Sequence, residues 1–509
     1  MERTVRVTGE GKAFYNQATM CVGTGRMDLA LQEEYQQHLS LVQDEIGFRY
    51  IRGHGLFSDQ MGIYREIEQN GKKIPFYNFT YLDRIYDSYL KKGIKPFVEL
   101  GFMPSALASG DQTIFYWKGN VTLPKDIHKW QQLVQKTIQH WLDRYGKEEV
   151  ESWLFEVWNE PNIDFLAGDI AEYCSFYQDT VTAVKQIDAA IKVGGPSICG
   201  VDVDRWLNGF FAYCQENQVP LDFVTRHCYC AKEPHSNGEY VHHHMNEPES
   251  MSAELKETHK IMEKYAVTRD VPLHITEFNT SYTPLCLVHD TVYNAAYVAD
   301  LLSRVGDDAD SYSYWTFSDV FEEQDVPKAE FYGGFGLVAA GGIRKPAFYT
   351  FQFFSRAGSE LLYRDEHMVI TKTADENYQV IAWNMTAQGL AETGKENPLI
   401  YQIFLPQIGG AEEMTELRTC VDSRHGNAAR NWCDLGSPRT PDAECLKEIQ
   451  ELSMPERTSR KLTSVGGYYE TQLILMDNMV MELRIKCCAD NDQPYYGFEK
   501  KYGFGLDIK

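Results

Sequence analysis

Long apolar runs are missing from this sequence, which contains no stretch of eighteen consecutive apolar residues. Because a helix needs about 20 such residues to cross a bilayer, we expect no transmembrane segment. The first residues, Met1–Val7, alternate polar and apolar side chains. A secretory signal instead needs a continuous apolar core of roughly 7–15 residues. We therefore expect a protein that is neither exported nor inserted in a membrane.

Positive charge is also scarce. The sequence has 49 lysines and arginines against 73 aspartates and glutamates, which gives a net charge of −24. Proteins that bind nucleic acids or anionic membranes present a basic face, so the charge balance argues against both kinds of partner. It is compatible with an enzyme that acts on a small neutral substrate.

Cofactor and metal motifs are lacking as well. No Gly-x-Gly-x-x-Gly follows the first predicted strand, which disfavours a doubly wound dinucleotide fold. The twelve cysteines are scattered, and Cys228, Cys230, His235 and the run His242–His244 do not have the spacing of a known zinc site. We expect a solvated loop there, no metal and no cofactor. Without an export signal, we expect reduced thiols and a cytoplasmic location.

Strand and helix patterns alternate from about residue 18. Amphipathic stripes predict helices around residues 130–145 and 292–302, each with apolar side chains at steps of three and four. Eight such units predict an α/β fold, a (β/α)8 TIM barrel over residues 18–345, with an open doubly wound sheet as the alternative. The predicted strands are Thr19–Gly23, Arg49–Arg52, Lys95–Leu100, Trp153–Trp158, Lys192–Gly195, Asp222–His227, Leu273–Thr276 and Ser311–Thr316.

The pattern changes in residues 346–509. After a last barrel helix, short segments alternate apolar and polar residues with period two, which predicts an appended antiparallel β-sandwich. We expect residues 1–17 to contribute a strand to it, and residues 387–398 and 409–465 to form long loops. The predicted sandwich strands are His367–Thr371, Gln379–Trp383, Tyr401–Leu405, Glu470–Met476 and Val480–Ile485.

Two carboxylates stand out at the predicted strand ends. Glu160 follows the fourth strand in Trp158-Asn159-Glu160-Pro161, and Glu277 ends the seventh strand. Since the active site of such a barrel lies at the carboxyl ends of its strands, the two should face each other across its mouth. Paired carboxylates are the groups that glycoside hydrolysis requires. A glutamate taken alone could equally cap the next helix or pair with an arginine.

Other polar and aromatic residues end the same strands. Arg52 and His54 follow the second strand, His227 ends the sixth, and Trp315 and Glu323 follow the eighth. Aromatic rings at a barrel mouth can stack on sugars, although core packing is the commoner role of a single ring. Each histidine could also be a core residue satisfied by the backbone, and Glu323 a solvated surface group. Glu99, on the third strand, is interpreted as a member of a barrel ion pair.

The motifs together resemble glycoside hydrolase family 39 of clan A, and in particular its bacterial β-xylosidase branch. The resemblance spans the predicted barrel. The His227–Cys230 stretch and the following Lys232–Asn246 do not match that branch, so the leaving-group side of the site is open. The motifs are Tyr-Ile-Arg-Gly-His-Gly (50–55), Phe-Glu-Val-Trp-Asn-Glu-Pro-Asn (155–162), Val-Gly-Gly-Pro (193–196), His-Ile-Thr-Glu-Phe-Asn-Thr-Ser-Tyr (274–282), Tyr-Trp-Thr-Phe-Ser-Asp-Val-Phe-Glu-Glu (314–323) and Gly-Gly-Phe-Gly-Leu (333–337).

The resemblance implies roles for these residues. A retaining mechanism is implied, with Glu160 as the general acid/base and Glu277 as the nucleophile. Asn159 would bind the sugar 2-hydroxyl. The implied pocket is completed by residues that bind hydroxyls, stack on the sugar or donate hydrogen bonds to Glu277, namely Arg52, His54, His227, Trp315 and Glu323.

The resulting prediction is an exo-acting β-D-xylosidase that releases xylose from xylo-oligosaccharides. A relative with another sugar preference stays open: an α-L-arabinosidase, a β-glucosidase, a β-galactosidase or an α-L-iduronidase. An iduronidase needs a cationic subsite and export, which the acidic composition and the missing signal disfavour. A non-catalytic sugar-binding barrel is the distant alternative. The branch also implies a homo-tetramer, with residues 409–465 in its contacts.

Overall fold

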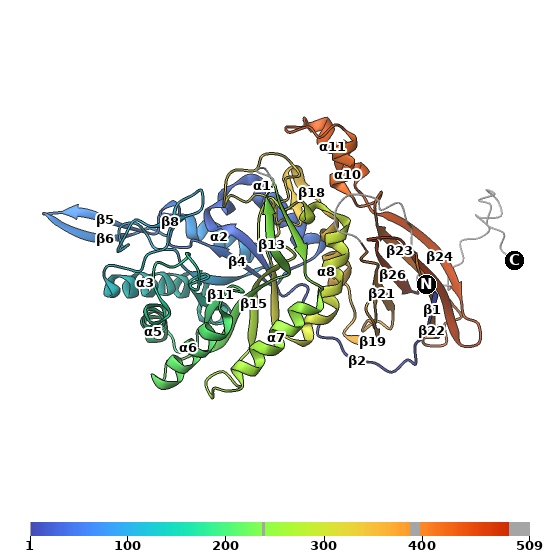
Figure 1. Ribbon diagram of the computed structural model, residues 1–509, viewed down its shortest axis with the longest axis horizontal. Coiled ribbons are helices and arrows are strands. Elements are labelled where there is room, and N and C mark those ends of the chain that lie inside the picture. Colours follow the sequence, from blue (N-terminus) through green and yellow to red (C-terminus); the bar gives the residue numbers. More distant parts are fainter. Residues whose placement is uncertain (1, 237–239, 387–397, 488–509) are drawn as a thin grey trace.

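Eight parallel strands close into a barrel in the computed structural model, which describes residues 2–236, 240–386 and 398–487 (Figure 1). Consecutive strands pair in chain order, and the eighth returns to the first through Ser313 and Cys21. All eight strand predictions are confirmed within a few residues, so the open-sheet alternative is wrong. The strands are β3 (Cys21–Arg26), β4 (Tyr50–His54), β7 (Lys95–Leu100), β10 (Leu154–Val157), β11 (Lys192–Ile198), β12 (Phe223–Tyr229), β15 (Leu273–Asn279) and β16 (Ser311–Tyr314).

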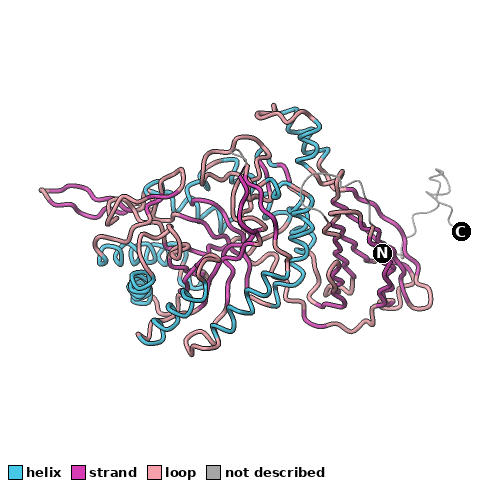
Figure 2. Tube along the Cα trace, viewed as in Figure 1, coloured by secondary structure: helices cyan, strands magenta, loops and turns pink. Residues whose placement is uncertain are grey.

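Helices surround the barrel because each has one apolar face to bury (Figure 2). In α3 the predicted stripe of Trp130, Leu133, Val134, Ile138 and Trp141 is buried. Asp126 begins that helix, since its carboxylate accepts hydrogen bonds from the free backbone N–H groups of the first turn. The barrel helices are α1 (Glu33–Glu45), α2 (Thr80–Lys91), α3 (Ile127–Tyr145), α4 (Lys147–Glu151), α5 (Ile170–Ile187), α6 (Val203–Glu216), α7 (Glu249–Met262), α8 (Val292–Arg304) and α9 (Pro346–Ser355).

Two sheets pack beside the barrel over a separate apolar core that includes Val380, Tyr401, Leu473 and Leu483. The N-terminal strand β1 (Glu2–Arg6) pairs in parallel with β22 of the smaller sheet. The smaller sheet is β1, β22 (Leu399–Pro406) and β25 (Tyr468–Leu475). The larger is β2 (Lys12–Ala13), β19 (Glu360–Arg364), β20 (Met368–Lys372), β21 (Tyr378–Trp383), β26 (Val480–Lys486), β23 (Glu413–Val421) and β24 (Glu456–Thr463).

The expectation of a long loop over residues 409–465 is wrong. The segment contains β23, α10 (Ala428–Asp434), α11 (Ala443–Leu452) and β24. Seven of the eight residues of β24 are exposed, so this edge strand is held by its backbone ladder and shows no apolar period. The two short helices bury only a few residues against the barrel loops. Most of the other expected loop, residues 387–397, lies outside the described residues.

Short hairpins extend the loops between barrel strands. β5 (Tyr64–Gln69) and β6 (Lys72–Tyr77) project from the left of the view in Figure 1. After β12 comes the pair β13 (Ala231–Ser236) and β14 (Val241–Met245), and smaller pairs are β8 (Thr113–Ile114) with β9 (Gly119–Asn120) and β17 (Val338–Ala339) with β18 (Ile343–Arg344). Among the described residues, no helix has the length and apolar character to span a membrane.

A buried lysine ties the last barrel unit together. Lys345 precedes α9 and is fully buried, with its Nζ 2.6 Å from Asp290 Oδ1 and in an ion pair with Asp319. The same Nζ donates to the carbonyl of Gly334 at 2.9 Å. Asp319 also accepts from the backbone N–H of Gly336 at 2.6 Å. The cluster therefore fixes the segment 333–337 over the end of β16.

Replacing this lysine should destabilise the protein in a pH-dependent way. Lys345→Met leaves two buried carboxylates without their cation, a loss of about 3–5 kcal/mol. Burial already raises the pKa of Asp319 to about 6, above its value in an unfolded chain. Protonation of Asp319 below about pH 6 thus favours the folded state, so the fall in melting temperature should be larger at pH 8 than at pH 5.

The matched control is Lys447→Met on α11, where the side chain is largely exposed. Its melting temperature should stay near that of the wild type at both pH values. A Lys345→Met protein that melts like this control would contradict the assigned role of the cluster.

Candidate active site

Both predicted carboxylates lie at the carboxyl-terminal mouth of the barrel. Glu160 follows β10, and the backbone has positive φ at Trp158 (72°) and again at Glu160 (43°). Non-glycine residues in this left-handed region are strained, and such strain concentrates at functional sites. The turn is held by the N–H of Glu160, which donates to the carbonyl of Ser197 at 2.9 Å. Glu277 needs no such turn, because it points inward from β15.

The two carboxyl groups approach each other closely. One oxygen of Glu160, one oxygen of Glu277 and one ring nitrogen of His227 all lie within 4.8 Å of one another. Carboxylate oxygens and an imidazole nitrogen are possible metal ligands. The guanidinium of Arg52, however, lies 2.8 Å from Glu277, and its positive charge disfavours a metal cation there. Cys228, on β12, and Cys230, between β12 and β13, are buried in the barrel core rather than exposed as ligands.

Arg52 organises the floor of the site. It is fully buried on β4, and its donors reach Glu277 Oε1 at 2.8 Å and Glu156 Oε2 at 2.6 Å. Its Nη2 also reaches Asn159 Oδ1 at 2.9 Å and lies 3.1 Å from Glu99. Burial alone would lower the pKa of Arg52, but the surrounding carboxylates raise it above its usual value. Arg52 therefore stays charged and orients both the predicted nucleophile and the predicted 2-hydroxyl ligand.

The sixth strand supplies two further contacts. His227 Nδ1 lies 2.8 Å from Glu160 Oε1 and 3.4 Å from Glu277 Oε2. Burial lowers the pKa of His227 to about 4, so the ring is neutral at pH 7. The hydroxyl of Tyr229 donates to Glu277 Oε2 at 2.7 Å. Sequence reasoning missed Tyr229 and Glu156, although Tyr229 stands two residues after His227 and so shares its face of the strand.

His54, Trp315 and Glu323 form one wall. His54 Nδ1 lies 2.6 Å from Glu99 Oε2, and its ring packs on Trp315 with centroids 4.5 Å apart. Burial opposes protonation of His54, but the charge and hydrogen bond of Glu99 raise its pKa to about 8. Burial raises the pKa of Glu323 to about 8. Glu99 thus lies behind the wall in an ion pair with Arg52 and His54.

These residues surround a cavity of about 470 Å³. Six of the predicted site residues line it, while Arg52 and His227 lie behind its surface and act through the carboxylates. Burial raises the pKa of Glu160 to about 7, so this group holds a proton near neutral pH. The predicted residues that line the cavity are His54, Asn159, Glu160, Glu277, Trp315 and Glu323.

Further parts of the chain complete the lining of the cavity. They are Ile163 and Phe165 after β10, Cys199 to Val201 after β11, and Glu254 of α7. The β13 residues Lys232 and Glu233 contribute to the rim. The segment after β11 lies beside Glu160, because Asn162, two residues further along the chain, donates hydrogen bonds to the carbonyls of Cys199 and Val201.

Comparison with known proteins gives a consistent result. A family model described as glycosyl hydrolases family 39 matches residues 3–470. A protein named beta-xylosidase from Geobacillus stearothermophilus is 47% identical over 503 residues, which cover 98% of each chain. Another beta-xylosidase, from Caldicellulosiruptor saccharolyticus, is 34% identical over 85% of this chain and 87% of its own length.

Solved structures agree with this result. The crystal structure of a protein described as a monomeric beta-xylosidase from Caulobacter crescentus CB15 aligns with a TM-score of 0.86 and 32% identity, over 96% of this chain and 100% of that chain. Human alpha-L-iduronidase, by contrast, matches at 29% identity over 30% of this chain and 24% of its own length. The resemblance that the strand-end motifs indicated is confirmed, and the chain belongs to glycosyl hydrolase family 39.

Proposed function

We propose that this protein is a retaining exo-β-D-xylosidase that releases xylose from xylo-oligosaccharides by double displacement. The single observation that carries the mechanism is the approach of Glu160 and Glu277, whose nearer oxygens lie within 4.8 Å. Retaining glycosidases hold their two carboxyl groups about 5–5.5 Å apart, whereas inverting ones leave roughly 6.5–9.5 Å for a water molecule. The short separation supports retention.

In the first step, Glu277 attacks the anomeric carbon while Glu160 gives its proton to the glycosidic oxygen. Arg52 and Tyr229 each donate a hydrogen bond to Glu277, which holds this carboxyl group in place and directs it at the sugar. Asn159, whose Oδ1 is occupied by Arg52, turns its amide nitrogen toward the 2-hydroxyl. The products of this step are a glycosyl ester on Glu277 and a free leaving-group alcohol.

In the second step, water hydrolyses the ester. The negative charge of Glu277 is neutralised in the ester, so the ionised form of Glu160 becomes easier to tolerate. Glu160 has given up its proton and now takes one from the attacking water. The sugar returns to its original anomeric configuration after two inversions, and both carboxyl groups recover their starting states.

The sugar preference is supported by the relatives and by the lining. In sequence, the curated relatives that match most of this chain are named beta-xylosidases, whereas the curated iduronidases match 30% of it. Among the described residues that line the cavity, Lys232 is the one lysine or arginine. It belongs to the hairpin rim and not to the wall of His54 and Glu323. A neutral pentose therefore suits this wall better than a sugar carboxylate.

Location and assembly belong to the same proposal. The eleven described cysteines carry free thiols, which supports a reducing, cytoplasmic environment. The homo-tetramer stays a prediction. A structural relative from Caulobacter crescentus is described as monomeric, so the oligomeric state differs within the family if this prediction is correct.

The substrate proposal predicts a clear order among aryl glycosides. The 4-nitrophenyl β-D-xyloside should have the highest kcat/KM, above the α-L-arabinofuranoside, β-D-glucoside and β-D-galactoside and above 4-methylumbelliferyl α-L-iduronide. The reason is that the curated relatives that match most of this chain in sequence are named beta-xylosidases. Preference for another glycoside would keep the two-carboxylate mechanism and reject the xylosidase proposal.

The roles of the carboxylates predict different rescue products. Glu277→Ala should lose nearly all activity, and azide should restore turnover as the glycosyl azide of inverted configuration, because azide enters the space left by the nucleophile. Glu160→Ala should still form the glycosyl ester from activated aryl xylosides, and azide should then give the retained product. The anomeric configuration of each glycosyl azide, measured by NMR, distinguishes the two roles. A glycosyl azide of retained configuration from Glu277→Ala would reverse the assignment.

The pKa of Glu160 predicts that the pH profile of kcat/KM has a descending limb on its basic side. Because the acid must be protonated and burial raises its pKa to about 7, kcat/KM for xylobiose should fall as the pH rises through about 7. The limb should be absent for β-xylosyl fluoride, whose leaving group needs no proton. It should also vanish in Glu160→Gln. A limb that survives in Glu160→Gln belongs to another group, such as Glu323, and contradicts this assignment.

A further inference from the structure

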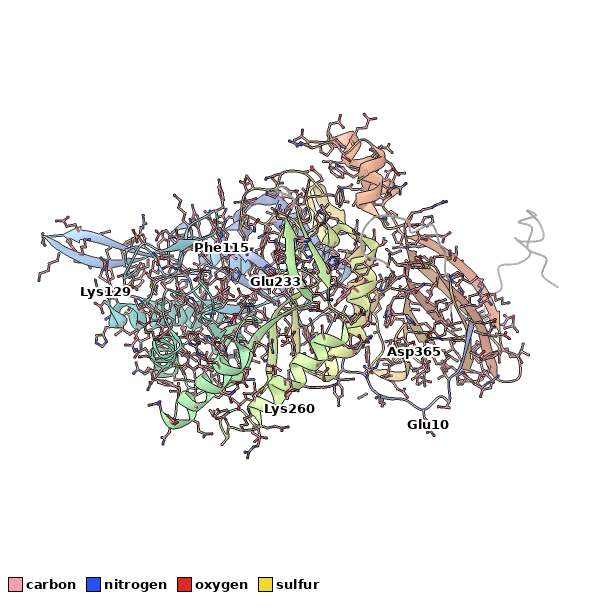
Figure 3. All side chains as sticks on the ribbon, in the orientation of Figure 1. Glu10, Phe115, Lys129, Glu233, Lys260 and Asp365 are labelled. Atoms are coloured by element: carbon pink, nitrogen blue, oxygen red, sulfur yellow. The ribbon has the colours of Figure 1, made fainter. Side chains whose placement is uncertain are left out.

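A second cavity opens beside the first. It has a volume of about 540 Å³ and lies between α6 and α7, where Asp204, Glu257 and Lys260 contribute to its lining. Gly200 and Glu254 line both cavities. In Figure 3, Glu233 marks the strand β13, which contributes to the lining of the first cavity, and Lys260 marks the lower part of α7. The two cavities therefore adjoin at Gly200 and Glu254.

Glu254 is held in place at this junction. Its Oε2 accepts a hydrogen bond of 3.0 Å from Nη2 of Arg226, whose side chain is only 2% exposed. Arg226 is itself fixed by a 2.6 Å bond from its Nη1 to Thr258 Oγ1. The side chain of Glu254 is nevertheless 43% exposed. The result is a carboxylate that is anchored from the interior and still available from the cavity.

A carboxylate of this kind suits a sugar better than a free surface glutamate does. Hydroxyl groups donate strong, short hydrogen bonds to an ionised oxygen. Because Arg226 has already restricted the side chain of Glu254, binding loses less conformational freedom. The backbone at Gly200 leaves room as well, since a Cβ added there would meet nothing within 4 Å. The junction is thus polar, partly rigid and unobstructed.

We propose that the leaving-group xylosyl residues of a xylo-oligosaccharide pass over Gly200, that Glu254 accepts hydrogen bonds from their hydroxyls, and that longer chains continue into the cleft between α6 and α7. The direction agrees with Glu160, the proposed acid, because Gly200 lies between Cys199 and Val201, whose carbonyls accept hydrogen bonds from Asn162, two residues after Glu160. This inference rests on the proposed function and adds the path of the chain beyond the cleaved bond. Glu254 is then a residue that determines specificity.

The test compares substrates that differ only on the leaving-group side. β-Xylosyl fluoride carries a leaving group of one atom, which cannot reach Glu254, whereas xylobiose carries a full sugar there. Glu254→Ala should lower kcat/KM for xylobiose about 10-fold, in line with the loss of a hydrogen bond to a charged group. The same variant should hydrolyse β-xylosyl fluoride at the wild-type rate. For the wild type, kcat/KM should rise from xylobiose to xylotriose as the cleft becomes occupied.

The control variants separate binding from folding. Glu263 lies at the C-terminal end of the same helix and outside both cavities. The variant Glu263→Ala should therefore hydrolyse every substrate with the kcat/KM of the wild type. Glu254→Gln keeps the shape and an acceptor oxygen, so its loss on xylobiose should be smaller than that of Glu254→Ala. The melting temperature of each variant shows whether the fold is intact.

The outcomes are distinct. An equal loss on xylobiose and the fluoride, or no loss on either, overturns the role of Glu254. A kcat/KM that does not rise from xylobiose to xylotriose overturns the extension into the cleft. A wild-type protein that hydrolyses neither β-xylosyl fluoride nor xylobiose overturns the proposed function itself rather than this inference.

Discussion

The site depends on one buried cation. Arg52 is removed from water on the second strand, and an isolated charge there would be very costly. Three carboxylates, Glu99, Glu156 and Glu277, surround it and come from three different strands. The arrangement is favourable only when these strands are in register, because a shift would separate the buried carboxylates from the cation that they share. The same ion pairs of Arg52 therefore hold the barrel strands in register and position the floor of the active site.

The environments of the two central carboxylates differ in a way that suits different tasks. Glu277 receives hydrogen bonds from a guanidinium and a phenol, whereas the partner of Glu160 is an imidazole that is itself neutral. Two residues of the same type thus have different hydrogen-bond partners, and burial raises the pKa of Glu160 to about 7, as suits a group that gives up a proton.

Sequence patterns predicted the parts of the fold that repeat. The eight barrel strands and the stripes of α3 and α8 were recognised because burial on one or both faces leaves a period in the sequence. Glu160 and Glu277 were predicted as the paired carboxylates because each stands near the carboxyl end of such a strand. Tyr229 and Glu254 were not predicted. The hydrogen bond from Tyr229 to Glu277 and the one from Arg226 to Glu254 depend on tertiary contacts, which produce no periodic pattern in the sequence. The error over residues 409–465 has the same origin, because the exposed edge strand β24 has no apolar face to detect.

The pairing of β1 with β22 bears on the order in which the chain can fold. These two strands lie side by side in the smaller sheet, yet the whole barrel separates them in the sequence. During synthesis from the N-terminus, β1 emerges first and then waits until the barrel and several later strands have been made. Closing so long a loop is entropically costly before the barrel is compact. The folded barrel therefore acts as the spacer that brings its own two ends together, and assembly of the β-sandwich is expected to follow barrel formation rather than precede it.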